Sequence, residues 1–240
     1  MPARFLELSV SAASVAAALE FYESLGFVQA SVGDAWSHPY AVVTDGRATL
    51  GLHGLADPAE PRLTFVTPEL RTRLEELSRA GLEVERARLD DVSLNEAEFR
   101  DPTGLHVRLL EARTFSPPAL EPVFESELGY FEGYVAGATD LVRTGQFWER
   151  LGFVAFLHAE GDATPRLVAS HRDVNVTFVD ADLAAPMLCF SAPDMAQRIA
   201  RLRGRGHAFA SRVPRSLQQG QAAVLHAPDA VQVLLVQSEA

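Results

Sequence analysis

The sequence lacks several features on which whole classes of protein depend. It has a single cysteine, Cys189, so it can form no internal disulfide. Because Cys189 lies in the apolar run MLCF, we predict a buried, unreactive thiol and not a nucleophile. The sequence contains no GxSxG, GxxxxGK[ST], GxGxxG or CxxC motif. Nucleophile-elbow, P-loop, Rossmann and thiol-redox chemistry therefore have no support in the sequence.

Positive charge and long apolar runs are also scarce. The formal net charge is −11 and no basic stripe is present, which argues against a nucleic-acid partner. No apolar run approaches the length of a membrane span, and the opening residues, MPARFLELSV, lack the apolar stretch of a signal peptide. We therefore expect a cytoplasmic protein without a membrane partner.

What the sequence does contain is an internal repeat. FYESLGFV begins at Phe21, and FWERLGFV begins 126 residues later at Phe147. RLEELSRAGLEV and DPTGLHVRLLEA, which begin at Arg73 and Asp101, also return in the same order as RIARLRGRGHAF and APDAVQVLLVQS. The fold must therefore be built from a repeated unit.

The pattern inside each repeat predicts the unit itself. Residues 4–10 alternate as a half-buried strand, and Ser14 is placed to cap a helix over 15–25 that Gly26 ends. Short strands follow over 27–32, 41–44 and 48–53, the last two joined by the Asp45-Gly46 turn. Residues 62–111 repeat this order with strands over 62–67, 82–88, 95–100 and 105–111 and a helix over 70–80.

The second half follows the same plan over 130–136, 141–151 and three further strands, then over 187–191, 195–203 and strands near residues 209, 223 and 231. The fold class is therefore α+β, with four βαβββ units. The proline-bearing stretch 114–127 is the natural linker between a first domain over 1–113 and a second over 128–240.

These residues carry a family resemblance over nearly the whole chain. FYESLGF and FWERLGF after a strand and helix, with DPTGLHVRLLEA closing a unit, resemble the vicinal oxygen chelate superfamily, which includes glyoxalase I, extradiol dioxygenases and bleomycin-resistance proteins. The resemblance implies two tandem glyoxalase/bleomycin-resistance-like domains, in which paired units wrap a curved sheet around a cleft. Function does not follow from that fold alone.

The resemblance also implies where a metal would bind, and the expected donors are mostly missing. Enzymes of the superfamily place His, Gln or Glu on the first strand of each unit and Glu on the closing strand, often in a DPxGxxxE pattern. Here Arg108 stands at that Glu position and Arg62 at the other ligand position, and a guanidinium has no lone pair to donate. In the second half the corresponding residues are Gly133, Met187 and Leu234. We therefore predict no metal and no other cofactor.

Strand alternation predicts which side chains face the first cleft. The set is unusually polar and comprises Glu7, Thr49, His53, Arg62, Thr64, His106 and Arg108. In one interpretation the face is simply solvated, and Glu7 pairs with Arg62 or Arg108. In another, the two arginines bind an anionic or carbonyl-bearing small molecule. A third keeps a metal on Glu7, His53 and His106, whose ligand types suit zinc or non-haem iron.

An aromatic loop precedes the third strand. Residues 33–43, GDAWSHPYAVV, bring Trp36, His38 and Tyr40 together, either to line a ligand pocket or to cover the end of a core. The favoured hypothesis is a metal-independent protein that sequesters a small organic ligand through Glu7, Trp36, Tyr40, His53, Arg62, His106 and Arg108. The alternatives are a metal-dependent lyase, isomerase or dioxygenase, and a structural dimer without ligand. A monomer and a homodimer are both compatible with the sequence.

Overall fold

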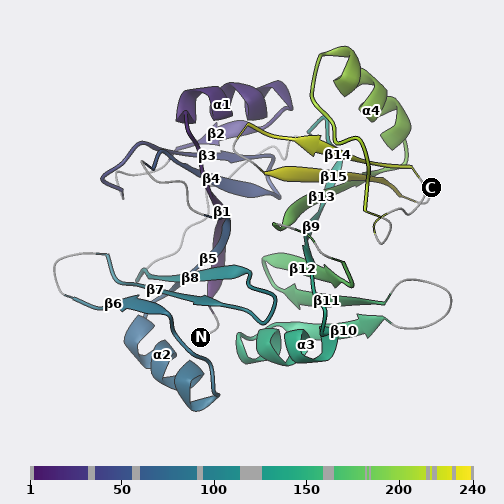
Figure 1. Cartoon of the computed structure of the whole chain (residues 1–240). Helices are drawn as coiled ribbons and strands as arrows, with labels where there is room; N and C mark the ends of the chain where they lie inside the picture. The colour runs from purple at the N-terminus through teal and green to yellow at the C-terminus, as the bar shows by residue number, and fades with distance from the viewer. Residues whose placement is uncertain are drawn as a thin grey trace. The chain divides into compact units, whose positions relative to one another are not determined.

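The computed structural model describes residues 3–31, 36–55, 60–90, 94–113, 126–158, 165–181, 183, 185–214, 217, 221–228 and 231–238. Residues 33–35 of the predicted aromatic loop and 114–125 of the predicted linker lie outside the described residues. The fold is α+β, with four helices and two mixed sheets in the described part of the chain (Figure 1).

The first half forms an eight-stranded sheet with the strand order β2-β3-β4-β1-β5-β8-β7-β6. Its elements are β1 (Arg4–Ser11), α1 (Val15–Ser24), β2 (Val28–Ala30), β3 (Tyr40–Thr44), β4 (Thr49–His53), β5 (Arg62–Thr67), α2 (Leu70–Arg79), β6 (Arg86–Arg88), β7 (Glu96–Arg100) and β8 (His106–Glu111). The predicted order of two βαβββ units is confirmed.

The second half forms a seven-stranded sheet with the order β10-β11-β12-β9-β13-β15-β14. Its elements are β9 (Tyr130–Gly137), α3 (Leu141–Arg150), β10 (Val154–His158), β11 (Arg166–His171), β12 (Val174–Val179), β13 (Met187–Ala192), α4 (Met195–Gly204), β14 (Ala222–His226) and β15 (Gln232–Gln237). The strand predicted near Phe209 is reduced to a single bridge between Phe209 and Leu225, and this accounts for the missing eighth strand.

Helix α1 begins and ends where the sequence predicts. The Ser14 side chain accepts a hydrogen bond from the Ala17 amide at 3.2 Å, which satisfies one of the amides that a helix start leaves unpaired. Gly26 then adopts a φ of +90°, a conformation that costs other residues energy. The same start and stop chemistry recurs in the second half, where the Asp140 side chain caps α3 by accepting from the Arg143 amide.

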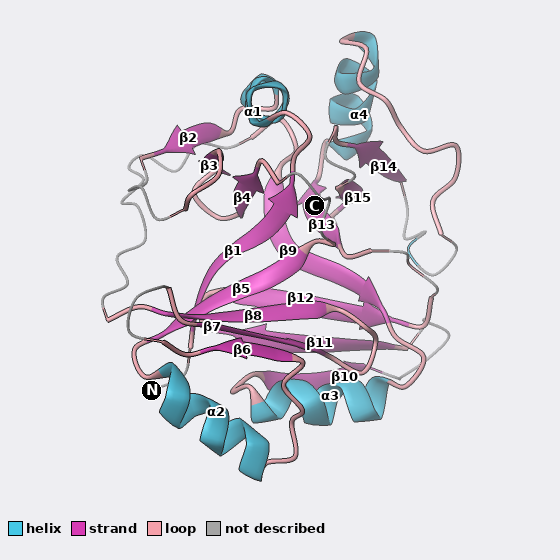
Figure 2. Ribbon diagram, turned by 60° about the vertical axis from the view of Figure 1, so that its left-hand side comes forward, coloured by secondary structure: helices cyan, strands magenta, loops and turns pink. Residues whose placement is uncertain are grey.

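The chain divides into two compact units, and each takes segments from both halves of the sequence. Unit 1 comprises Met1–Leu8, Arg62–Ala119 and Ala136–Asp182. Unit 2 comprises Ser9–Pro61, Leu120–Val135 and Leu183–Ala240. Unit 1 therefore contains β5–β8 and β10–β12 with helices α2 and α3, which lie along one side of these strands in Figure 2. Unit 2 contains β2–β4 and β13–β15 with α1 and α4.

The DPTG turn of the first half connects the two halves inside unit 1. The buried Asp101 carboxylate accepts hydrogen bonds from the amides of Thr103 and Leu105 at 2.8 and 2.9 Å, which closes the turn. Its second oxygen accepts from Trp148 Nε1 at 3.0 Å. Burial raises the pKa of Asp101, and these donors offset part of that rise. The motif therefore has a structural role in joining β8 to α3.

Candidate functional site

Four strands of unit 1 place a row of polar side chains on one face of the sheet. In the pairing register Thr64 of β5 lies opposite Arg108 of β8, Arg108 opposite Glu98 of β7, and Glu98 opposite Arg86 of β6. Residues directly opposite in neighbouring strands share a face, and so do residues two apart along a strand. Arg62 therefore joins the same face, as strand alternation predicts.

Glu98 is the centre of this row. Its Oε1 atom accepts hydrogen bonds from Arg62 Nη1 at 2.6 Å and from Arg108 Nε at 3.0 Å, and it forms an ion pair with Arg108 Nη2 at 2.9 Å. Its Oε2 atom accepts from Arg86 Nη2 at 2.9 Å. The side chains of Arg62, Arg108 and Glu98 are only 11%, 10% and 13% exposed, while that of Arg86 is 67% exposed. One carboxylate thus holds two nearly buried guanidiniums and one solvated guanidinium, and we name these four residues the Glu98 cluster.

The charges of the Glu98 cluster shift one another's pKa values. Although burial alone would raise the pKa of Glu98, the guanidiniums of Arg108 and Arg62 outweigh it and lower that pKa. Burial lowers the pKa of Arg62, and the neighbouring Arg108 lowers it further. Glu96 adds a second carboxylate, 3.7 Å from Arg108 Nε, but it also pairs with Arg88 at 3.0 Å. Four guanidiniums therefore surround two carboxylates in a chain whose formal net charge is −11.

Glu98 is not among the residues that the sequence pattern predicts for the site. The sequence offers Glu7 as a partner of Arg62 or Arg108, and the structure adds Glu98, which accepts hydrogen bonds from both arginines. Glu7 lies on β1 and is 1% exposed. The signal was present in the strand EAEFR, where Ala97 and Phe99 are buried in the core and Glu96 and Glu98 must therefore face the other side.

Two other predicted site residues lie on the same strands. Thr64 is fully buried beside Arg108. His106 is half-buried and lies between Arg62 of β5 and Arg100 of β7 in the pairing register. The structure thus brings Arg62, Thr64, His106 and Arg108 onto one face of adjacent strands.

A second cluster lies in unit 2 and consists of four rings. His38 Nε2 lies 2.8 Å from His53 Nδ1, which is hydrogen-bond distance. The His53 ring is 4.7 Å from the Tyr40 ring and 5.1 Å from the Trp36 ring, the latter edge to face. His53 is 3% exposed, while Trp36, His38 and Tyr40 are half-buried. The loop therefore brings its aromatic residues together as predicted, and we name these four residues the ring cluster.

The contact between His38 and His53 depends on the protonation of the two rings. A hydrogen bond between two imidazoles needs one nitrogen that carries a proton and one that does not. The pair is held in place by the β3–β4 hairpin, which sets Tyr40 opposite His53. The ring cluster therefore presents apolar ring surface together with one polar handle, a combination common in small-molecule sites.

The residues at the ligand positions of the resemblance do not suit a metal. Arg62 and Arg108 carry no lone pair, and two cations would repel a third. In the described residues no group of three or more His, Cys, Asp or Glu side chains is arranged to hold an ion. In the second sheet the register pairs Cys189 with both Gly133 and Leu234, and burial, followed by the charge of Glu132, raises the pKa of the Cys189 thiol to about 12. Burial therefore gives a physical reason for the unreactive thiol that the sequence predicts.

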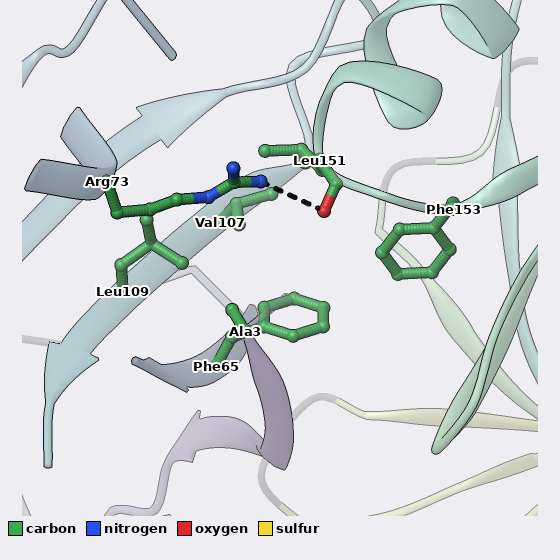
Figure 3. Close-up of a pocket in the computed structure, with 7 residues that line it drawn as sticks. All are labelled: Ala3, Phe65, Arg73, Val107, Leu109, Leu151 and Phe153. Atoms are coloured by element: carbon green, nitrogen blue, oxygen red, sulfur yellow. Dashed lines mark hydrogen bonds between the residues drawn. The ribbon is translucent and has the colours of Figure 1, made fainter. Parts of the chain in front are cut away.

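A small pocket in unit 1 lies on the opposite face of the same strands (Figure 3). It is lined by Ala3, Phe65, Arg73, Val107, Leu109, Leu151 and Phe153. Phe65 and Val107 alternate with Thr64 and Arg108, so the pocket faces the helices and not the Glu98 cluster. Arg73 Nη2 donates to the Leu151 carbonyl at 3.3 Å across its rim. The pocket has room for about one water molecule, and we assign it to packing.

Comparison with solved structures identifies the fold. The chain is similar to a catechol 2,3-dioxygenase (15% identity, 99% of this chain and 88% of that chain, TM-score 0.61). It is similar to a 2,3-dioxygenase from Pseudomonas sp. KL28 (15%, 99% and 92%, 0.63) and to a variant of homoprotocatechuate 2,3-dioxygenase from Brevibacterium fuscum (14%, 97% and 70%, 0.64). The chain has the vicinal oxygen chelate fold. No protein-family model and no curated protein matches the sequence.

The vicinal oxygen chelate fold agrees with the resemblance read from the repeat. At identities near 15% the likeness shows the fold alone, so the activity of these dioxygenases does not transfer to the chain. None of the helices in the described residues is long and apolar enough to cross a membrane.

Proposed function

We propose that the protein binds a small organic anion at the Glu98 cluster without a metal. The observation that carries the proposal is that the same row in the second half contains no charge. The second-half counterparts of Arg108 and Glu98 are Leu234 and Val224, which pair opposite each other in the same way. Since an apolar pair supports the same strand register, the ionic row is not needed to build the sheet.

The chemistry of the Glu98 cluster suits a carboxylate or another oxyanion. Guanidiniums bind such groups through paired N–H donors, and burial strengthens these bonds because little water competes for them. Arg86 is mostly exposed and can turn from Glu98 toward a ligand at little cost.

We propose further that the ring cluster contacts an aromatic or apolar group of a ligand. Trp36 and Tyr40 offer ring faces, and the His38–His53 pair adds polar nitrogen atoms beside them. The two contributions are tested separately. If variants of the Glu98 cluster lose carboxylate binding, that cluster is the anion site. If variants of the ring cluster lose binding of an aromatic group, that cluster is the aromatic site.

A thermal-shift panel of aromatic carboxylates with their uncharged amides tests the anion site. We expect benzoate-type acids to raise the melting temperature of the wild-type protein more than the matching amides do. The Arg62→Met/Glu98→Val/Arg108→Leu variant should lose this difference, and Arg143→Ala, which removes an exposed arginine of α3, should keep it. Equal shifts for acids and amides, or an unchanged response of the triple variant, would refute the anion site.

The second candidate is a metal-dependent enzyme. Glu7, His53 and His106, the ligands expected from the sequence, form no metal-binding group in the described part of the structure. The enzyme is favoured by the likeness to dioxygenases. Elemental analysis of protein purified without chelator separates the two functions. Near-stoichiometric zinc, iron, nickel or manganese would overturn the metal-independent proposal and support the metal-dependent candidate. Both proposals place the protein in the cytoplasm, which cell fractionation tests.

A further inference from the structure

The two sheets end in four edge strands, and three of these edges are protected against pairing with another chain. β2 and β6 have three residues each, and β6 carries the exposed arginines Arg86 and Arg88. β14 is covered by residues 208–210, since the Ala210 amide donates to the Val224 carbonyl at 2.8 Å and the His226 amide donates to the Ala208 carbonyl at 3.0 Å. Short length, charge and a covering segment are the usual ways in which proteins protect an edge.

The fourth edge strand, β10, has none of these protections in the described residues. All five of its residues pair with β11 on one side, and no described strand pairs with the other side. Its sequence, VAFLH, carries no acidic or permanently charged side chain. Val154, Phe156 and Leu157 are 57%, 54% and 48% exposed. An uncharged apolar strand with a free edge is expected to pair with a further strand.

Exposed apolar side chains are concentrated around this edge. Among the described residues five large hydrophobic side chains are exposed, and four of them lie on β10 or on α3, namely Val142, Val154, Phe156 and Leu157. The fifth, Tyr130, contacts the Arg47 guanidinium, which lies 4.5 Å from its ring centre. The corresponding edge strand of the first half has the sequence VQA, with the polar Gln29 exposed. The apolar edge is therefore particular to the second half.

We propose that β10 is a dimer interface, on which β10 of a second copy pairs in antiparallel register about Phe156. A two-fold axis through Phe156 places Val154 opposite His158 and Ala155 opposite Leu157 of the other copy. No like charges then meet, although the chain as a whole carries a net charge of −11 that repels a second copy. One interaction satisfies the free backbone groups of both edges, which favours the identical strand as the partner.

Helix α3 extends the proposed interface. Gly145 of α3 packs on Ala155, where an added Cβ would lie 3.5 Å from the Ala155 Cβ, so the helix lies directly over β10. In the dimer each β10 brings its α3 to the same side of the joined sheet, with Val142 exposed on the helix. The two sheets become one continuous sheet, and burial of the apolar side chains adds to the backbone hydrogen bonds.

Sedimentation velocity of the full chain over a wide concentration range tests the proposal. We expect the wild-type protein to sediment as a dimer, and Phe156→Lys to raise the dimer dissociation constant by about tenfold or more. Gln29→Lys adds the same charge to the corresponding edge of the first half and should remain a dimer. Val154→Lys, also at an exposed position, provides a second variant, and circular dichroism reports whether each variant is folded.

Hydrogen exchange gives an independent readout. The amides of β10 should exchange more slowly in the wild-type protein than in Phe156→Lys, while those of β2 should not differ. A wild-type protein that is monomeric at all concentrations would overturn the proposal. So would a dimer that survives both lysine variants, because its interface would then lie elsewhere.

Discussion

The Glu98 cluster and its counterpart in the second half occupy the same positions of the same fold and have opposite chemistry. In the first half the row consists of Arg62, Thr64, Arg108 and Glu98, and in the second half of Met187, Cys189, Leu234 and Val224. The second-half residues are at most 9% exposed. Both rows keep the same parallel and antiparallel pairing.

The second half shows that this strand pairing does not require charge. A buried ion pair costs desolvation energy that its attraction only partly returns, and apolar residues of similar size are often as stable. The second half represents that apolar solution. The charged solution in the first half therefore needs another explanation, and recognition of an anionic ligand supplies one.

Removal of the central carboxylate should have the largest effect on the first half. Glu98→Gln leaves the guanidiniums of Arg62 and Arg108 close together without a counter-charge, and we expect the free energy of unfolding to fall by about 3 kcal/mol. Urea unfolding measures the loss. Glu76→Gln removes a half-exposed carboxylate that pairs with Arg73 within α2, and we expect a loss of less than about 0.5 kcal/mol. Equal losses of unfolding free energy in the two variants would show that Glu98 stabilises the protein no more than an exposed carboxylate does.

Conversion of the first row to the second should cost less than breaking it. In Arg62→Met/Glu98→Val/Arg108→Leu the charges leave together, and we expect the free energy of unfolding to change by about 1–2 kcal/mol in either direction. The same variant should lose its response to aromatic carboxylates. A destabilisation larger than that of Glu98→Gln would mean that the ionic row stabilises the sheet and would remove the main support for a ligand site.

The sequence predicts much of the fold and several residues of the Glu98 cluster, but it does not predict that Glu98 is the partner of the two arginines. Ser14 as a cap and the common face of Arg62 and Arg108 follow from local patterns, because helix ends and strand alternation depend on near neighbours. The choice of Glu98 as partner depends on which residue of β7 meets Arg108, and that register is set by the intervening turn. The bond from Trp148 to Asp101 spans 47 residues. No periodicity in a single sequence predicts such contacts.

The hairpins of the two halves offer a sharper comparison through pH. Asp45 of the β3–β4 turn and His171 of the β11–β12 hairpin are counterparts, 126 residues apart. Burial raises the pKa of Asp45, and backbone donors only partly offset it. Burial lowers the pKa of His171, whose ring centre is 5.0 Å from that of Phe153, and nearby Asp173 only partly offsets it. In both, burial favours the neutral form.

The two shifts have opposite consequences for stability. As pH falls below about 6.5 the unfolded chain protonates His171 more readily than the folded chain does, so stability decreases toward the lowered folded pKa. As pH falls through the raised pKa of Asp45 the folded chain takes up the proton first, so stability increases. Each slope is at most about 1.4 kcal/mol per pH unit.

Single variants separate the two contributions. We expect His171→Asn to flatten the decrease in melting temperature between neutral and mildly acidic pH, and Asp45→Asn to raise the melting temperature at neutral pH. Burial, followed by the charge of Arg205, also lowers the pKa of His207, so His207→Asn measures the remaining decrease. A pH profile of His171→Asn identical to that of the wild type would show that the burial of His171 has no energetic effect.

The smallest expected effect is a difference in thiol pKa between equivalent positions of the two halves. Cys189 has a pKa of about 12 in its apolar row, whereas its counterpart Thr64 lies beside Arg108. We expect the thiol of Thr64→Cys, in a Cys189→Ser background, to ionise at a lower pH than Cys189 does, because a guanidinium stabilises the thiolate. Titration of thiolate absorbance measures both. Identical titrations would show that the charge of Arg108 is fully cancelled by Glu98.

The mixed composition of the two units has a consequence for synthesis on the ribosome. Unit 1 is complete once Asp182 has emerged, whereas the strands and helix that finish unit 2 are the last to be translated. The ring centres of Phe27 and Phe190 lie 6.3 Å apart in the folded protein. Because Phe190 is translated late, this contact forms only near the end of synthesis. We expect the first helix and its strands to need protection by chaperones in the meantime, since apolar surface exposed on a nascent chain promotes aggregation. Contacts between segments far apart in the chain form slowly. A variant that weakens the last three strands should therefore reduce the soluble yield before it destabilises unit 1.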